Sequence, residues 1–207
     1  MSPIDFHLYF ITDRHKCQPR PLTEVVKEAC EAGIKAVQLR EKDLSPVELF
    51  HMAEELKKIC QSYRAKLFIN DRMDVAMAVE ADGIQLTSKS LPVDVVRRFY
   101  SRLIGVSTHS LDEALLAQKG GADFILFGPV FYTPSKIQYG EPQGLSRLQH
   151  ITLNVKLPVF AVGGITSDRA KTCLEAGAHG VAVISAIMSS ENIKASVCEF
   201  KKRLQDL

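Results

Sequence analysis

Short apolar runs alternate with segments of helical periodicity along the whole chain, and this alternation constrains the fold most strongly. The predicted strands cover residues 8–12, 35–40, 66–70, 82–86, 103–107, 122–127, 158–162 and 179–184. The predicted helices cover 22–32, 45–63, 72–80, 92–99, 110–119, 145–153, 167–176 and 191–205. Strands that alternate with helices form a parallel sheet, so this pattern predicts an α/β fold, a single (βα)8 TIM barrel over residues 1–207.

The ends of the predicted helices carry residues typical of helix boundaries. Ser45 and Pro46 suit the N-cap and first position of helix 45–63. Ser110 with Glu113 has the spacing of a capping box, and Gly33 and Gly177 are C-terminal stops. These local signals support the division into strand and helix repeats.

Length and composition fit one compact domain. The chain has 207 residues, 46% hydrophobic and 24% charged, which is enough for a substantial core at the small end for such barrels. A net charge of +2 with interspersed acids and bases gives no basic patch, so we expect no nucleic-acid or membrane partner. No apolar run reaches transmembrane length and residues 1–5 lack signal-peptide features, so we expect a cytoplasmic protein.

The five cysteines, at positions 17, 30, 60, 173 and 198, show no CxxC or Cys/His ligand spacing. Four of them fall on predicted helices and have the character of small core or interface residues. We therefore expect no zinc site.

The last two strand ends predict a phosphate site. Residues 160–166 and 177–186 contain short apolar runs that end in small or hydroxyl residues, as buried parallel strands do before a loop. Gly163 and Gly164 let a ligand approach the backbone closely, and Ile184 with Ser185 opens a turn whose N–H groups can bind an anion. Phosphate is frequently held by the loops after strands seven and eight of such barrels.

The second predicted strand ends in polar side chains that can converge on the mouth of the barrel. Gln38 and Arg40 alternate with Leu39 and so point to one side, and Lys42 lies just beyond. Two cations with an amide suit a phosphate or a diphosphate. The alternative is a solvated salt-bridge cluster with Glu41.

Asn70 and Asp71 end the third predicted strand. They either cap the following helix or hold a divalent cation through oxygen ligands. The fourth strand ends Thr87-Ser88-Lys89-Ser90, with hydroxyls and a lysine but no carboxylate. A magnesium site is expected to have a second acid near this point, so both interpretations of Asp71 stay open.

His109 follows the fifth predicted strand, directly before a helix N-terminus. That location favours a neutral imidazole, which can both accept and donate a proton. A helix-capping or surface histidine is the alternative. Among the other histidines only His15, in the first loop, is a rival for this role.

The connection from Gly128 to Gly144 is long and rich in Gly, Pro and Tyr. Loops of this size in compact domains are often functional lids. Its hydroxyls, lysine and aromatic residues can hold a phosphate and cover an aromatic ligand. A packing role alone is the alternative.

Seven motifs, in order along the chain, carry a resemblance to a known family. They are Gln38-Leu39-Arg40-Glu41-Lys42, Ile69-Asn70-Asp71-Arg72, Ala81-Asp82-Gly83-Ile84, Ser107-Thr108-His109-Ser110, Gly128-Pro129-Val130-Phe131 through Thr133-Pro134-Ser135-Lys136, Val162-Gly163-Gly164-Ile165 and Val183-Ile184-Ser185-Ala186. Together they resemble the thiamin phosphate synthase and TenI family over nearly the whole chain. Synthases of this family join hydroxymethylpyrimidine diphosphate to a thiazole phosphate. The TenI branch aromatises a carboxythiazole phosphate by moving a proton.

The resemblance implies a set of ligand-binding residues. Positions for the pyrimidine diphosphate match Gln38, Arg40, Lys42, Asn70, Ser107 and Lys136, and positions for the thiazole phosphate match Thr133, Ser135, Gly164, Ile184 and Ser185. Asp71 matches one magnesium ligand. The fourth strand departs from the synthase pattern, because Gln85 replaces a histidine and Ser90 stands where the second metal aspartate belongs. Loss of such a ligand is expected to weaken Mg²⁺-dependent chemistry by roughly 10- to 100-fold or more.

We therefore favour a TenI-like thiazole tautomerase, which needs no cofactor, over a synthase, which would need Mg²⁺. The resemblance assigns the proton transfer to His109, and such a transfer contributes about 10² to 10⁴ in rate. The alternatives are the synthase and a regulatory protein that binds a thiazole phosphate without turnover. The sequence leaves open a homodimer, and whether Glu41 or His15 relays the proton.

Overall fold

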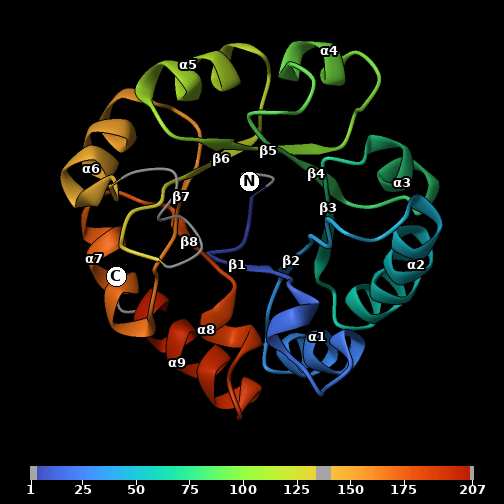
Figure 1. Cartoon of the computed structure of the whole chain (residues 1–207). Helices are drawn as coiled ribbons and strands as arrows, with labels where there is room; N and C mark the ends of the chain where they lie inside the picture. The colour runs from blue at the N-terminus through green and yellow to red at the C-terminus, as the bar shows by residue number, and fades with distance from the viewer. Residues whose placement is uncertain (1–3, 134–140, 206–207) are drawn as a thin grey trace.

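The computed structural model describes residues 4–133 and 141–205, in which parallel strands close into a barrel in sequence order (Figure 1). The strands are β1 (Leu8–Ile11), β2 (Ala36–Leu39), β3 (Lys66–Asn70), β4 (Gly83–Leu86), β5 (Leu103–Thr108), β6 (Phe124–Phe127), β7 (Val159–Val162) and β8 (Gly180–Val183). Phe10 of β1 pairs with Val183 of β8 and closes the ring. The predicted (βα)8 TIM barrel is confirmed.

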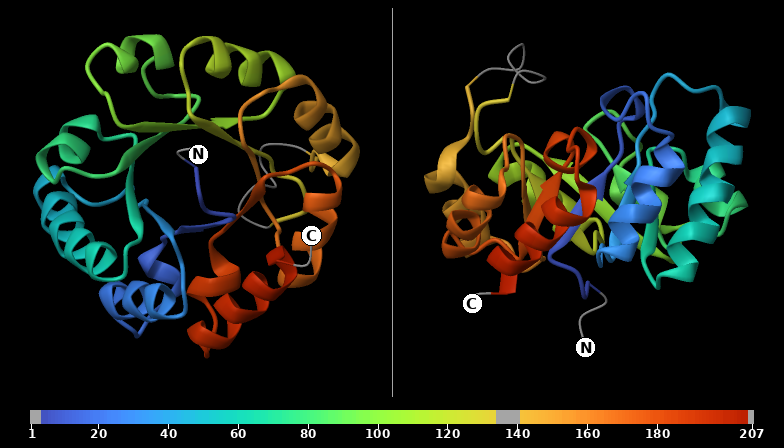
Figure 2. Two further views of the ribbon diagram at one scale, coloured as in Figure 1. Left: turned by 180° about the vertical axis from the view of Figure 1, so that it is seen from behind. Right: turned by 90° about the horizontal axis from the view of Figure 1, so that it is seen from below.

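Helices surround the barrel, and the two views of Figure 2 show them as an outer layer around the strands. They are α1 (Leu22–Glu31), α2 (Pro46–Ser62), α3 (Met73–Ala78), α4 (Val93–Arg97), α5 (Leu111–Lys119), α6 (Gly144–Asn154), α7 (Ser167–Glu175), α8 (Ser185–Met188) and α9 (Ile193–Gln205), with a 3-10 helix, η1, at Arg14–Lys16. The pattern does not predict α8 or η1, because so few residues show no helical periodicity. Among the described residues, no helix has both the length and the apolar character needed to cross a bilayer.

The helix boundaries follow the sequence signals. Glu48 donates its backbone N–H to Ser45 Oγ at 3.3 Å, and Ser45 donates its backbone N–H to the Glu48 carboxylate at 2.8 Å. This reciprocal capping box starts α2, with Pro46 at its first position. Gly33 and Gly177 follow the C-caps of α1 and α7, as predicted.

Aromatic rings fill the barrel near the N-terminal ends of the strands. Tyr9, Phe68, Phe124 and Phe160 pack together there, with Phe6 in contact with all four. The rings of Tyr9 and Phe68 meet edge to face with their centroids 5.3 Å apart. A Cβ on Gly105 would lie 2.3 Å from the Phe124 ring, so the ring occupies the space that a larger residue on β5 would need. This packed layer leaves the opposite end of the barrel, where the strands end, for ligand binding.

The outward faces of the strands pack against the helices in a second apolar layer. Cys30, Cys60 and Cys173 are buried in this layer, as expected of small core residues. Cys198 is exposed on α9 instead. Cys17 is also buried, so four of the five thiols lie in the interior.

Candidate functional site

A row of polar side chains lies above the aromatic layer, toward the C-terminal ends of β2 to β5. The Gln38 amide donates to Asn70 Oδ1 at 3.2 Å, and the Gln85 amide donates to Ser107 Oγ at 3.2 Å. Asn70 and Gln85 are register partners on β3 and β4, which places the two pairs side by side. The structure thus brings together Gln38, Asn70 and Ser107, and it adds Gln85. We call these four residues the polar row.

The polar row contains two unpaired acceptors. Gln38 is 2% exposed and Gln85 1% exposed, and Oε1 of each has no hydrogen-bond partner in the described part of the chain. A buried polar atom without a partner costs about 1–3 kcal/mol. The amide N–H groups point toward Asn70 and Ser107 at the strand ends, whereas Gln85 Oε1 lies beside Gly105 and the Phe124 ring.

A buried carboxylate, Glu41, fixes the loop that carries Arg40 and Lys42. It accepts a hydrogen bond from Thr12 Oγ1 at 2.6 Å. It also accepts bonds from the backbone N–H of Arg14 at 3.1 and 3.2 Å and from Arg14 Nη1 at 3.2 Å. Thr12 Oγ1 accepts the backbone N–H of Arg40 at 2.9 Å. The loops after β1 and β2 are therefore locked together, with Arg14 as the ionic partner of Glu41.

Arg14 extends this contact to the rim of the barrel. Its guanidinium donates to both oxygens of Asp43, at 2.6 and 2.5 Å. These bonds hold the pKa of Asp43 well below its usual range and raise the pKa of Arg14. His15 Nε2 lies 3.0 Å from Asp43 Oδ2, so the rival histidine also lies at the exposed rim.

Asp71 and Ser90 meet at the mouth although they follow different strands. Asp71 has a φ of +63°, and its backbone N–H donates to Gln85 O at 2.9 Å. The Ser90 hydroxyl donates to Asp71 Oδ1, and the backbone N–H of Thr87 donates to Ser90 Oγ at 2.8 Å. The position where the sequence lacks a carboxylate therefore places a hydroxyl against the Asp71 carboxylate.

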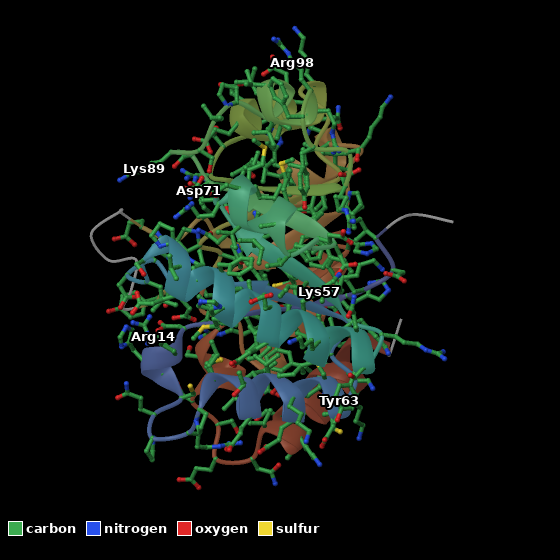
Figure 3. The ribbon with its side chains drawn as sticks, turned by 90° about the vertical axis from the view of Figure 1, so that its right-hand side faces the viewer. Arg14, Lys57, Tyr63, Asp71, Lys89 and Arg98 are labelled. Carbon is green, nitrogen blue, oxygen red and sulfur yellow. The ribbon has the colours of Figure 1, made fainter. Side chains whose placement is uncertain are left out.

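Two cavities open beside Asp71. The first, of about 330 Å³, is lined by Asp71, Met73, Ile84, Leu86, Lys89, Ser90, Leu91, Pro92 and Val96. The second, of about 290 Å³, is lined by Leu39, Glu41, Lys42, Leu44, Leu49, Asn70, Asp71, Arg72, Thr87 and Lys89. Figure 3 shows Arg14, Asp71 and Lys89 toward the same edge of the molecule, with Lys57 and Tyr63 set back from it. Three predicted site residues, Lys42, Asn70 and Asp71, thus share the second cavity.

Oxygen ligands for a divalent cation are present at this edge. A carboxylate and a hydroxyl are hard ligands, and Mg²⁺ is commonly held by one or two carboxylates together with substrate phosphates. Within residues 4–133 and 141–205, no three His, Cys, Asp or Glu side chains cluster as a metal site. Asp71 and Ser90 therefore fit a magnesium ion shared with a bound diphosphate better than one held by protein alone.

The loops after β6 and β7 are in close contact. The backbone N–H of Phe131 donates to Gly163 O at 3.0 Å. Gly164 has a φ of +64°, and a Cβ on it would lie 2.4 Å from Tyr132 O. The close approach of these loops therefore requires glycine at position 164, apart from the predicted contact with a ligand.

The remaining predicted phosphate residues lie at the next strand end. Ile184 follows β8 directly, and Ser185 begins α8. Because β7 and β8 are paired neighbours, Gly163 and Gly164 lie at the adjacent strand end. A short extra helix in this region is a recurrent feature of phosphate sites in TIM barrels.

The start of the 128–144 connection is described as far as Thr133, which is half-buried. Phe131 is half-buried as well, whereas Tyr132 is 63% exposed. Ser135 and Lys136 lie outside the described residues. The lid function of this connection stays a prediction.

His109 has a carboxylate neighbour that sequence reasoning did not assign to it. Its Nδ1 lies 3.2 Å from Glu113 Oε2, and its backbone N–H donates to the same oxygen at 2.7 Å. The backbone N–H of Glu113 donates to Ser110 Oγ at 3.2 Å, so the Ser110 half of the predicted capping box forms. The i,i+4 spacing of His109 and Glu113 is the signal that could have identified the pair. The catalytic role of His109 stays a prediction.

Two further histidines lie at the N-terminal end of the barrel. The rings of His7 and His179 have their centroids 4.5 Å apart, and His179 Nε2 lies 3.1 Å from Phe6 O. Burial lowers the pKa of His179. This pair is therefore separated from the polar row by the aromatic layer.

Comparisons with known proteins agree with this geometry. A model of the family described as thiamine monophosphate synthase matches residues 8–187. A Geobacter sulfurreducens protein, named as a candidate thiamine-phosphate synthase, is 47% identical over 91% of this chain and 90% of its own. Thiamine-phosphate synthase of Pyrococcus furiosus is 40% identical over 97% of this chain and 95% of its own. A solved structure named thiamine phosphate pyrophosphorylase, also from Pyrococcus furiosus, superposes with a TM-score of 0.89 at 39% identity and covers 97% of this chain and 96% of its own.

Proposed function

Because the chain belongs to the thiamine monophosphate synthase family, we propose that it is a thiamine-phosphate synthase, which joins hydroxymethylpyrimidine diphosphate to a thiazole phosphate. The names of its similar relatives support this activity more than the TenI-like tautomerase that the sequence motifs favour. Both activities belong to thiamine biosynthesis and use small phosphorylated substrates. The difference between them lies in the chemistry at the mouth of the barrel.

The polar row carries the proposal. The amide and hydroxyl groups of the polar row would bind the ring nitrogens and the amino group of an aminopyrimidine. The row therefore favours a second, nitrogen-rich substrate in the barrel.

Charge at the rim suits the departure of diphosphate. As the bond from the pyrimidine methylene group to diphosphate breaks, positive charge develops on the pyrimidine and negative charge on the leaving group. Arg40 and Lys42, on the loop held by Glu41, would bind and neutralise the diphosphate. When bound by Asp71 and Ser90, Mg²⁺ would supply further positive charge to the leaving group. The thiazole nitrogen then forms the new C–N bond.

The contact between Ser90 and Asp71 bears on the main objection from the sequence. The fourth strand lacks an aspartate, but its Ser90 hydroxyl contacts the Asp71 carboxylate directly. A neutral ligand at this position, with diphosphate oxygens completing the shell, is compatible with magnesium chemistry. We expect a weaker metal site than two carboxylates would make.

One observation favours the tautomerase as a second candidate. The ring of His109 lies next to the Glu113 carboxylate, and a carboxylate partner orients an imidazole for proton transfer. In this alternative His109 would move the proton of a thiazole phosphate anchored near Gly164 and Ser185.

Parallel assays separate the candidates. The purified chain is given hydroxymethylpyrimidine diphosphate, thiazole phosphate and Mg²⁺, and separately the non-aromatic carboxythiazole phosphate, whose aromatisation is followed by ultraviolet absorbance. The synthase proposal predicts thiamine phosphate, a large loss in Asp71→Asn, and little change in the matched surface variant Asp168→Asn.

The opposite pattern would reject the proposal. Fast aromatisation that His109→Ala abolishes, without thiamine phosphate, would establish the tautomerase. Binding of a thiazole phosphate without either product would favour the regulatory binder.

A further inference from the structure

Arg169, in the first turn of α7, connects the two loops at the predicted phosphate site. Its Nη1 donates a hydrogen bond to Gly164 O at 2.7 Å. Its guanidinium carbon lies over the Phe131 ring, 4.7 Å from the ring centroid. The Arg169 side chain therefore contacts both loops: it binds the backbone of Gly164 after β7 and packs on the ring of Phe131 after β6.

Backbone bonds bring these loops together just before the contacts of Arg169. The backbone N–H of Val130 donates to Val162 O at 2.9 Å, and that of Phe131 donates to Gly163 O at 3.0 Å. The two acceptors, Val162 and Gly163, are successive residues at the C-terminal end of β7. The hydrogen bond from Arg169 reaches Gly164, the next residue in this direction, and so extends the contact by one step.

The positive charge of Arg169 is not neutralised by a nearby carboxylate. In the part of the chain that the structure describes, no acidic oxygen lies within 4.0 Å of its guanidinium nitrogens. The adjacent Asp168 pairs instead with Arg203, at 3.1 Å. No carboxylate among the described residues offsets the charge of this guanidinium, so the charge attracts an anion bound on the nearby glycines.

We propose that Arg169 is a positioning residue for the phosphate end of the site. It holds Gly164 and Phe131 in the arrangement that receives the phosphate group, and its charge adds to the attraction. The inference rests on the proposed function for the identity of the ligand, a thiazole phosphate.

The expected effect is moderate and local. Arg169 is exposed, and an exposed hydrogen bond and an exposed cation–π contact each shift an equilibrium by a factor of a few, so losing both should weaken phosphate binding about tenfold. The polar row on β2 to β5 belongs to other strands. Binding at that end should therefore not change.

Isothermal titration calorimetry on the full chain tests the proposal without relying on turnover. Thiazole phosphate and its dephosphorylated alcohol are titrated into the wild type, Arg169→Met, Phe131→Leu and the double variant. Arg203→Met is the matched control, because it removes an exposed arginine that contacts α7 through Asp168 but no loop of the site. Arg169→Lys keeps the charge without the flat guanidinium, and thermal unfolding checks that each variant is folded.

We expect Arg169→Met to raise the Kd of thiazole phosphate about tenfold and to leave the Kd of the alcohol unchanged. The Kd of Arg169→Lys for thiazole phosphate should lie between those of Arg169→Met and the wild type. The fold increase in Kd for the double variant should be smaller than the product of the fold increases for the two single variants, because either change alone breaks the contact between Arg169 and Phe131.

Three results would overturn the role of Arg169: a Kd equal to that of the wild type, an equal loss for the alcohol, or single losses that multiply. A wild type that binds no thiazole phosphate would reject the proposed function and this inference together. A wild type that binds thiazole phosphate, with Arg169→Met unaffected, would reject the inference alone.

Discussion

Replacing Glu41 with glutamine should destabilise the barrel and loosen the diphosphate end of the site. Glu41→Gln keeps the shape of the side chain but removes its charge and turns one acceptor oxygen into a donor. The side chain is 2% exposed, and its carboxylate receives the Thr12 hydroxyl and both the backbone N–H and the guanidinium of Arg14. At least one of these donors would then face the amide NH₂ group of the introduced glutamine.

The magnitude follows from these contacts. A hydrogen bond to a charged group contributes about 1.5–3 kcal/mol, and an unpaired buried donor adds a further cost. Arg14 keeps its bonds to Asp43 and stays partly solvated, which limits the total loss of unfolding free energy to about 2–3 kcal/mol. For a chain of this size we expect a fall in Tm of roughly 5–10 °C.

Thermal unfolding followed by circular dichroism measures this effect, with Asp43→Asn as the matched control. Asp43 binds the same arginine from the solvent side, where screening weakens the pair, so its loss should change Tm little. Glu41→Gln should also raise the KM for the pyrimidine diphosphate, since Thr12 links Glu41 to the backbone of Arg40. A Tm within about 2 °C of the wild type, which is less than 1 kcal/mol by the same scaling, would refute the reasoning.

Other substitutions test the remaining parts of the account. Gly164→Ala should lower the unfolding free energy by about 1–3 kcal/mol in denaturant titrations, because the φ of +64° and the nearby Tyr132 O leave no room for a methyl group; an unchanged midpoint would contradict this. Ser90→Asp should tighten Mn²⁺ binding, measured by electron paramagnetic resonance, by roughly tenfold or more, because it adds a carboxylate beside Asp71; unchanged affinity would exclude Ser90 from the metal site. Burial lowers the pKa of His179 in the folded chain. As the pH decreases below roughly 6.5, the unfolded chain therefore binds more protons than the folded chain, and the free energy of unfolding decreases. Tm measured from pH 7.5 to 5.5 should show this fall, and His179→Asn should reduce it; an equal slope in the variant would contradict the assignment.

The sequence predicts the barrel well because strand and helix periods alternate along the whole chain. The predicted C-terminal ends of the strands lie within one residue of the observed ends, and the structure brings Gln38, Asn70 and Ser107 together. Strand alternation carries this information, since every second residue of a strand faces the interior. The aromatic layer below them follows from the same rule.

Contacts between loops are harder to predict. The bond from Ser90 to Asp71 joins the loops after two different strands and depends on the positive φ of Asp71. The contact of Arg169 with Phe131 links residues that lie far apart in the sequence. Neither has a period or a local spacing that a pattern could reveal.

The choice between synthase and tautomerase also depends on contacts that the sequence does not reveal. The absence of an aspartate at position 90 is visible in the sequence, whereas the hydroxyl contact that partly replaces it is visible only in the structure. The hydrogen bonds within the polar row are likewise a property of the folded interior. Both features favour the synthase.

Phosphorus-31 NMR on the purified chain with both substrates and Mg²⁺ tests the central claim most directly. The synthase account predicts that inorganic diphosphate and thiamine phosphate appear in equal amounts, and that omission of Mg²⁺ or the Asp71→Asn substitution suppresses both signals. Substrate signals that stay unchanged at enzyme concentrations comparable to the substrates would contradict it.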